Sequence, residues 1–422
     1  MILTSSAAEE DAAPNRWNFK KADWLSFHVQ CSSALTEETV ISAEDPTGQF
    51  TDILIQAAAI PKTRFSKKLP KVPWFSDSCK KAVKERKKAQ RKNSVTDNYS
   101  SQCQRIKMLK GKRRLDFSST NEEDYTLPFS MTELKQSLWR TNDLATGLDQ
   151  VHYHLLTHLP KSALSVLLRV YNHDWESGCF LPLWCDLVVI PIPKPGKDHS
   201  DPSNFRPIAL TSCLCKTMER MINACLMWSL ESQGLLSERQ CSFRKNRSTL
   251  DHLVRFETFI RNAFIKKEHV LTIFFGLEKA YDTTWKHSNL ADLWDLGFRG
   301  HLPMFIQMFL SEHSFKVRVS STLLELHKQE MGVPQSSILP PVLFSIKIND
   351  IVKAVLKGMA CSLFVDDLAL CVSGKTLNRV ERAMQLCVNS IQECMSENGF
   401  MFSTFKTVCI HFTSNTFFFP RP

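Results

Sequence analysis

Two adjacent aspartates, Asp366 and Asp367, lie between two short apolar runs at residues 361–365 and 368–372. Buried like charges raise each other's pKa and destabilise a fold unless a counter-ion joins them. A hairpin with both carboxylates at its tip would bring their oxygens together, and hard oxygen ligands favour Mg²⁺ or Mn²⁺. An exposed turn that carries two aspartates by chance is the alternative, because acidic residues are common in turns. The pair therefore indicates either an ordinary turn or a divalent-metal site of the kind that supports phosphoryl transfer.

A strongly basic segment lies earlier in the chain. Residues 62–114 hold 19 Lys and Arg against three acidic residues, whereas the whole chain has a net charge of +10. Such a segment releases the counter-ions of a phosphate backbone, so it predicts tight, salt-sensitive and sequence-independent binding of nucleic acid. A solvated basic helix is the alternative that stays open. The candidate nucleic-acid-binding residues are Lys80, Lys81, Lys84, Arg86, Lys87, Lys88, Arg91 and Lys92.

The composition is that of a folded globular protein. The 422 residues are 43% hydrophobic and 23% charged, and this length predicts two or three domains. No stretch approaches the roughly 18 apolar residues of a membrane span, so no membrane partner is expected. The 14 cysteines are scattered without an export signal, which predicts reduced thiols and an intracellular protein of the nucleus or cytoplasm. The oligomeric state does not follow from the sequence.

Helices and strands are expected to alternate irregularly from residue 126, which favours an α+β fold over a bundle or a sandwich. A helix should begin at Ser130-Met-Thr-Glu133, which has the pattern of a capping box. Further helices are expected at 155–171, 285–296, 338–356 and 377–397. Strands are expected at 185–192, 269–275, 361–365, 368–372 and 401–412, with a strand pair inside 315–331.

Several motifs accompany the acidic pair in a fixed order. They are Ile190-Pro-Ile-Pro-Lys194-Pro-Gly-Lys197-Asp198, Asn204-Phe-Arg206-Pro-Ile-Ala-Leu210, Gln240-Cys-Ser-Phe243-Arg-Lys-Asn-Arg-Ser-Thr249, Gly332-Val-Pro-Gln335 and Phe364-Val365-Asp366-Asp367. In this order and at these intervals, residues 126–412 resemble the reverse transcriptase of jockey-type non-LTR retrotransposons. The resemblance implies an RNA-directed DNA polymerase from a mobile element.

The fold implied by the resemblance is a right-hand polymerase with fingers and an antiparallel palm sheet, and with the thumb absent. Truncation and partial degeneration of the element are part of this interpretation. The implied divisions are a poorly defined N-terminal remnant at 1–60, a basic connector at 61–125, a fingers-like region with the start of the palm at 126–270, the palm at 271–412 and a tail at 413–422.

The resemblance also implies the catalytic residues. Asp366 and Asp367 correspond to two of three metal-binding aspartates, which would hold two Mg²⁺ (or Mn²⁺) ions, and Lys406 corresponds to a lysine thought to assist pyrophosphate departure. The family's third aspartate falls on Gly276, in Phe275-Gly276-Leu277-Glu278-Lys279-Ala280-Tyr281-Asp282. Loss of one such contact costs about 3 to 4 kcal/mol, so impaired polymerisation is expected. Glu278 is a poor substitute, because its α-carbon would be displaced by roughly 6.5 Å.

The nucleotide-binding residues are implied in the same way. Lys194 and Arg206 would contact the incoming triphosphate, while Tyr281 and Gln335 would shape the nucleotide pocket. A core tyrosine is the alternative for Tyr281, because aromatic side chains fill cores. The implied partners are an RNA template, a DNA primer and deoxynucleoside triphosphates.

Other motif positions also depart from the family. Ser336 and Ser242 stand where the family has glycine, and Pro340 removes a backbone donor near an expected helix start. Thr146-Gly147 replaces Pro-Gly. His154 and His158 could share a helix face, but a surface or core pair is favoured over a metal site because no third ligand is suggested.

Three functions stay open for this chain, and its own enzymatic activity is not decided. The first is a reverse transcriptase domain. The second is a non-catalytic nucleic-acid-binding remnant of the element. The third is a two-metal nuclease, which the acidic pair alone would permit.

Overall fold

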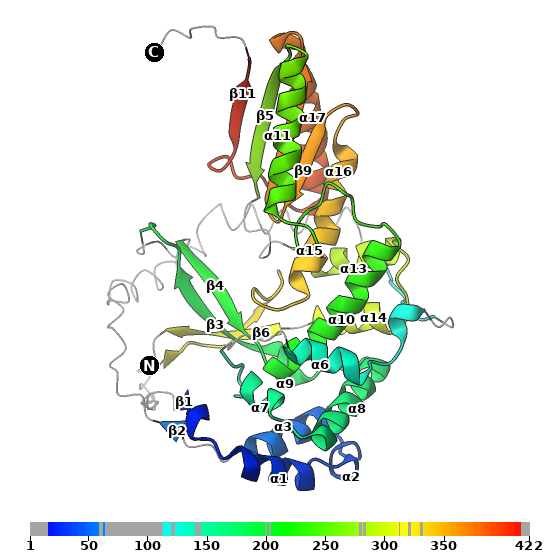
Figure 1. Cartoon of the computed structure of the whole chain (residues 1–422), viewed down its shortest axis with the longest axis vertical. Coiled ribbons are helices and arrows are strands. Elements are labelled where there is room, and N and C mark those ends of the chain that lie inside the picture. Colours follow the sequence, from blue (N-terminus) through cyan, green and yellow to red (C-terminus); the bar gives the residue numbers. More distant parts are fainter. Residues whose placement is uncertain are drawn as a thin grey trace, which may run out of the picture.

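The computed structural model describes residues 16–58, 62–63, 113–119, 123–139, 145–198, 201, 204–277, 281, 284–311, 313–319, 322–329 and 332–414. The upper part in Figure 1 is a sheet between helices, and the lower part is a second sheet beside a group of helices. One sheet is antiparallel and the other is mixed, so the expected α+β class is confirmed.

The upper sheet has four antiparallel strands in the order β11-β5-β10-β9. They are β5 (His269–Gly276), β9 (Ala360–Phe364), β10 (Asp367–Gly374) and β11 (Val408–Phe412). Strands β9 and β10 form the hairpin predicted around the acidic pair. The strand expected at 401–412 is shorter, because residues 403–407 form a turn in which the Lys406 and Thr407 amides donate to the Ser403 carbonyl.

The two faces of this sheet carry different helices. Side chains alternate along a strand, so Phe275 and Leu368 point to one face while Phe274 and Ala369 point to the other. The first face packs on α17 (Leu377–Asn398), which ends at the left-handed Gly399. The second face, which also bears Asp367, is covered by α11 (Thr249–Ile265), as Figure 1 shows.

The lower sheet is mixed. It contains β3 (Asp186–Pro193), β4 (Phe205–Leu210), β6 (His313–Val319), β7 (Thr322–Leu323) and β8 (His327–Gln329). The order is β4-β3-β6-β7, β8 also pairs with β6, and β3 runs parallel to β6. The pair expected inside 315–331 is therefore three short strands, and the parallel pairing joins segments far apart in the sequence.

The lower helices build the main core. It centres on α8 (Lys161–Ser177), α10 (Cys213–Ser232) and α14 (His301–Phe309), where Trp175 is fully buried. The capping box at the start of α6 (Met131–Trp139) is confirmed, since the Ser130 amide donates to Glu133 Oε2 at 2.7 Å and the Glu133 amide donates to Ser130 Oγ at 3.3 Å. The predicted helix 155–171 is divided before α8 at Pro160, which cannot donate to a continuous helix.

Residues 16–58 are folded, although the sequence predicted no structure there. They form α1 (Trp24–Ala34), α2 (Glu37–Val40) and α3 (Pro46–Ala57), which pack on α8. The Thr47 hydroxyl donates to the buried Asp174 carboxylate at 2.6 Å. A short strand pair joins β1 (Arg16–Trp17) to β2 (Lys62–Thr63), which is the start of the basic segment. The eight predicted nucleic-acid-binding residues lie outside the described residues.

The remaining elements are short or connect the two parts. The helix predicted at 338–356 is divided into α15 (Pro340–Asn349) and α16 (Ile351–Ala354). The others are η1 (Phe19–Lys21), η2 (Asp124–Thr126), α7 (Tyr153–Thr157), α9 (Pro182–Cys185) and α13 (Lys286–Asp295). None of the helices described here is long and apolar enough to cross a membrane. The cysteines in these residues are free thiols.

Candidate active site

The acidic pair lies at the tip of the β9–β10 hairpin. Val365 turns the chain there with a left-handed φ of 56°, which is uncommon for a β-branched residue. Asp367 is already the first residue of β10, and the Asp366 carbonyl accepts from the Leu277 amide at 3.0 Å. Both carboxylates are therefore held at the end of the antiparallel sheet, beside the last residues of β5.

Gly276 lies directly beside this tip, in register with Asp367. The Ser403 amide donates to the Gly276 carbonyl at 2.8 Å, which brings the following turn against the glycine. A Cβ atom at position 276 would lie 2.7 Å from Lys406 Cδ and 3.0 Å from Lys406 Cβ. Lys406 Nζ lies 3.7 Å from Asp366 Oδ2. The lysine thus crosses the space of the missing side chain and reaches the acidic pair.

The electrostatics of the tip involve a histidine that sequence reasoning missed. Partial burial and the neighbouring Asp366 raise the pKa of Asp367, while Lys406 and His252 act in the opposite direction. His252 belongs to α11 and shares a hydrogen bond with Ser362 Oγ of β9. Burial lowers the pKa of His252, and Asp367 opposes this. No sequence motif pointed to His252, because its contact arises only when α11 lies on the sheet.

Tyr281 lies beside the same tip. Burial, and then the Asp366 charge, raise the pKa of Tyr281 to about 12, so the phenol keeps its proton at neutral pH. Its ring packs on Phe344 of α15 with centroids 5.2 Å apart. Tyr281 is therefore packed against a core side chain and also close to the acidic pair, so the packed tyrosine and the site tyrosine do not exclude each other. Glu278 and Asp282 lie outside the described residues.

The other predicted nucleotide-binding residues belong to the mixed sheet and to the loop 332–339. Arg206 is on β4, and the Lys194 amide donates to the Asn204 carbonyl at 2.8 Å where the β3–β4 hairpin closes. The loop joins this hairpin through β4, because the Ala209 amide donates to the Gln335 carbonyl at 2.9 Å. These residues are thus tied together, separately from the acidic tip.

Ser336 takes the backbone conformation that the family's glycine would favour. Its φ is 89°, in the region that L side chains rarely adopt, and its hydroxyl donates to the Ala209 carbonyl. Only glycine fits at position 147, because a Cβ atom there would lie 2.7 Å from the Ser212 amide nitrogen. Ser242 is buried and donates to Gln240 Oε1 at 3.0 Å, so its hydroxyl is accommodated.

A buried carboxylate holds the far end of the loop 332–339. Glu219 of α10 accepts from the Ser337 hydroxyl at 2.6 Å and from the Ile338 and Leu339 amides at 2.8 and 3.1 Å. These groups immediately precede α15, so Glu219 caps that helix. Pro340 is the first residue of α15, where a missing donor costs nothing. Sequence reasoning missed Glu219, although an acidic residue on a mostly apolar helix was a possible signal.

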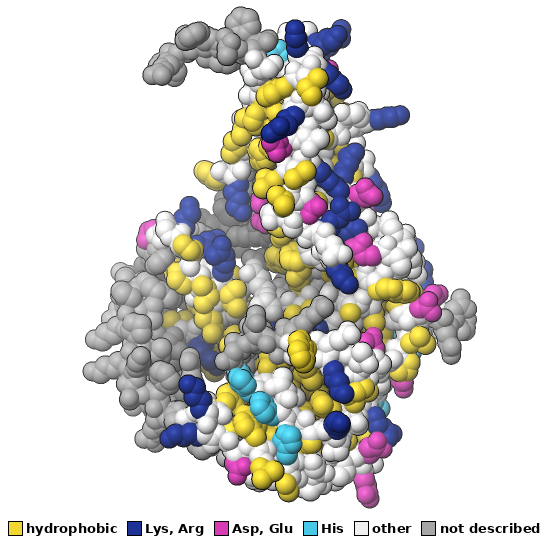
Figure 2. Space-filling view, in the orientation of Figure 1, with side chains coloured by type: hydrophobic (Ala, Val, Ile, Leu, Met, Phe, Trp, Pro, Cys, Tyr) yellow, Lys and Arg dark blue, Asp and Glu magenta, His cyan; other side chains and the backbone are white. Residues whose placement is uncertain are grey.

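The predicted histidine pair is packed among aromatic rings. His158 stacks on Trp24 with ring centroids 3.8 Å apart. The ring centroid of Phe19 lies 4.7 Å from the ring centroids of both His152 and His154. Figure 2 shows histidine side chains in a row over this region. Among the residues that the structure describes, no group of three or more His, Cys, Asp or Glu side chains could hold a metal ion. The ring contacts show that both histidines pack against aromatic side chains.

Residues 192–419 match the family described as "Reverse transcriptase (RNA-dependent DNA polymerase)". The match covers more than half of the chain and includes β4 of the mixed sheet, the loop 332–339 and the acidic tip. The chain therefore belongs to the reverse transcriptase family, as the sequence motifs predicted.

The chain is related to the jockey group of this family. It is 30% identical over 245 residues to a probable RNA-directed DNA polymerase from transposon BS of Drosophila melanogaster, covering 57% of this chain and 27% of that protein. It is 26% identical over 278 residues to the RNA-directed DNA polymerase from mobile element jockey of the same species, covering 64% of this chain and 30% of that protein. The chain thus matches less than a third of these relatives' length.

Proposed function

We propose that this chain is the fingers and palm part of an RNA-directed DNA polymerase from a jockey-type non-LTR retrotransposon, with polymerisation impaired by Gly276. It would bind an RNA template annealed to a DNA primer. The observation that carries the proposal is the register of Gly276 with Asp367, which leaves the expected third carboxylate position without a side chain.

The donor set fits a divalent cation only in part. Asp366 and Asp367 are the residues that would hold Mg²⁺ or Mn²⁺, and such an ion would neutralise phosphate oxygens of a nucleotide. Two carboxylates instead of three are a poor match for the pair of ions that the family implies. Lys406 places a further positive charge 3.7 Å from Asp366.

The chain's own residues suit nucleotide binding. Lys194 and Arg206 are cationic groups at the β3–β4 hairpin, suited to a triphosphate. Gln335 is held against β4, and Tyr281 keeps a neutral phenol beside the acidic tip. We infer that these residues bind and orient the nucleotide, while Lys406 holds a proton near the position of the leaving pyrophosphate.

The expected impairment is large. Removal of one well-placed electrostatic contact costs about 3 to 4 kcal/mol, or roughly 10²- to 10³-fold in rate. A metal ligand should matter at least as much.

Primer extension on an RNA template tests the proposal. The unchanged chain is run beside Gly276→Asp and Gly276→Asn at equal folded concentration, with Mg²⁺ and then Mn²⁺. The amide has the size of the carboxylate without its charge, so Gly276→Asn is the matched control for the contact with Lys406. We expect extension by the Asp variant to exceed the others by roughly 10²-fold.

Two other outcomes would change the conclusion. Equal extension by the unchanged chain and Gly276→Asp would contradict the role given to Gly276. Extension by none of the three, with the template–primer still bound, would favour the non-catalytic nucleic-acid-binding remnant, which Lys406 in the space of the missing side chain also supports. The nuclease alternative has less support, because the described residues hold no larger cluster of metal ligands.

A further inference from the structure

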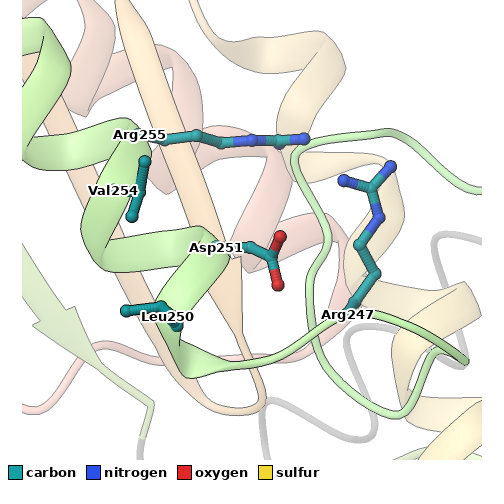
Figure 3. Close-up of a pocket in the computed structure, with 5 residues that line it drawn as sticks. All are labelled: Arg247, Leu250, Asp251, Val254 and Arg255. Atoms are coloured by element: carbon teal, nitrogen blue, oxygen red, sulfur yellow. The ribbon is translucent and has the colours of Figure 1, made fainter.

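A cavity of about 350 Å³ opens beside the start of α11. It is lined by Arg247, Leu250, Asp251, Val254 and Arg255. Figure 3 shows the two guanidinium groups pointing into the same space from the loop before α11 and from the second turn of the helix, with the Asp251 carboxylate beside them. The site has no part in the nucleotide binding proposed above.

The cavity lies on the outer side of α11. The inner side of the helix carries His252 and Phe256, which contact Ser362 and Phe274 of the palm sheet. The cavity is thus separated from the acidic face by one helix, whose diameter is about 10 Å. A strand of nucleic acid leaving the acidic tip could reach it within a few nucleotides.

Fixed contacts hold the charged groups around the cavity. The Arg255 guanidinium donates to the Glu238 carbonyl, which aims the side chain while leaving further N–H groups for a ligand. The Ser248 amide donates to Asp251 Oδ2 at 2.7 Å, and this bond lowers the pKa of Asp251, so the carboxylate is ionised at neutral pH. Ser248 and Asp251 cap the helix, which leaves the arginines as the donors for a ligand.

The surroundings are basic with an apolar border. Residues 237–255 contain five Lys and Arg and two acidic residues. Lys and Arg side chains also gather along the right flank of the upper part in Figure 2. Leu250, Leu253 and Val254 are 66%, 55% and 50% exposed. A phosphate with an attached sugar suits this combination, since guanidinium forks bind phosphate oxygens and the apolar border suits a deoxyribose or ribose ring.

We propose that Arg247 and Arg255 bind one backbone phosphate of the template–primer at this cavity. The inference rests on the proposed function, because it assumes that the chain binds nucleic acid. Asp251 limits the affinity, since its charge opposes that of the phosphate.

Binding of a fluorescein-labelled RNA template–DNA primer hybrid, measured over a range of salt concentrations, tests this site. Each phosphate contact contributes about 0.7 to 0.9 to the slope of log K against log salt. Arg247→Gln and Arg255→Gln should each reduce the slope by up to that amount. Arg261→Gln is the matched control, because Arg261 is on the same helix but is exposed and paired with Glu257 at 2.7 Å. This control should leave the slope unchanged.

Asp251→Asn provides an independent test in the opposite direction. It removes the opposing charge and keeps an oxygen acceptor for the Ser248 amide, so we expect tighter binding of the hybrid at low salt. If Arg247→Gln or Arg255→Gln melts at a lower temperature than the unchanged chain, its loss of binding could come from unfolding, and Asp251→Asn then becomes the deciding test. Weaker or unchanged binding by Asp251→Asn would then overturn the proposal.

The failures of the two proposals are distinguishable. If the unchanged chain binds the hybrid and the two glutamine variants have its slope, the phosphate site is wrong while nucleic-acid binding stands. An equal loss of slope in Arg261→Gln also overturns the site, because it would reflect net charge alone. If the unchanged chain does not bind the hybrid, both proposals fall.

Discussion

Gly276, which under the proposed function takes the place of a metal-binding aspartate, leaves room for Lys406. The lysine is accommodated because glycine has no Cβ atom to meet its side chain. The resulting ion pair with Asp366 is largely solvated, with side chains 58% and 39% exposed, and such pairs contribute little to stability. Lys406 can therefore swing away when a larger residue is introduced at position 276, which makes Gly276→Asp a feasible substitution.

A second single residue predicts how stability depends on pH. His313 of β6 is 2% exposed, and burial followed by the charge of Lys286 lowers its pKa to about 4 from an ordinary value of 6.5. The unfolded chain therefore binds this proton first as the pH falls. The contribution of His313 to the free energy of unfolding is complete above pH 6.5 and is lost between about pH 6.5 and 4, amounting to roughly 3 kcal/mol.

Urea denaturation at a series of pH values measures this contribution. We expect His313→Asn to flatten the fall in stability over that pH interval. His327→Asn, at an exposed position on the neighbouring strand β8, serves as the control and should leave the fall unchanged. An equally steep fall in the His313 variant would show that other groups cause the acid sensitivity.

At the scale of elements, the loop 332–339 is the joint between the two parts of the molecule. It is tied to β4 through Ala209 and to α10 through Glu219, and it leads directly into α15. Helix α15 in turn packs against Tyr281 through Phe344. The loop therefore couples the strand that carries Arg206 to the surroundings of the acidic tip.

Glu219→Ala should destabilise this joint. The substitution leaves the Ile338 and Leu339 amides and the Ser337 hydroxyl without their buried acceptor, at a cost of about 3 to 5 kcal/mol in the free energy of unfolding. Chemical denaturation measures that change, and hydrogen exchange of the Ile338 and Leu339 amides locates it.

Two variants separate this effect from the mere loss of a charge. Glu219→Gln keeps one acceptor oxygen and should be less destabilising, while Glu393→Ala, at an exposed site on α17, should have little effect. Exchange of the two amides that is as slow in Glu219→Ala as in the unchanged chain would rule out the capping role.

At the scale of the whole molecule, charge is concentrated in one segment. Residues 62–114 hold 19 Lys and Arg against three acidic residues, whereas the whole chain has a net charge of +10, and they follow the helices that pack on α8. The start of the segment, Lys62–Thr63, pairs with Arg16–Trp17 ahead of those helices. Phosphate binding by this segment would add to that of the folded part.

Neutralising the basic segment 62–114 should weaken the binding of RNA whatever the RNA sequence. We expect replacement of its eight central cations by glutamine to lower the salt slope for single-stranded RNA by up to about 0.7 for each lost phosphate contact. Filter binding between low and physiological salt measures the slope, and a thermal melt checks that the fold is kept. An unchanged slope would instead support the solvated basic helix. The replaced residues are Lys80, Lys81, Lys84, Arg86, Lys87, Lys88, Arg91 and Lys92.

Much of the local structure could be predicted from the sequence, because local patterns carry it. The capping box at Ser130, the hairpin around Asp366 and the end of α17 at Gly399 each depend on residues a few positions apart. The family and its acidic pair followed from motifs in the same way. Gly276 was identified from its motif position alone.

Only the tertiary structure decided which distant segments meet. The parallel pairing of β3 with β6, the capping of α15 by Glu219 and the contact of His252 with Ser362 each join residues at least 100 positions apart. Such contacts leave no local pattern in the sequence. A buried hydrogen-bond donor can be satisfied by any acceptor that the fold brings near it, so the sequence alone does not specify the partner. The contact of Lys406 with Gly276 is of the same kind. The sequence by itself determined the chemistry available at the acidic tip, and packing decided which neighbours that chemistry has.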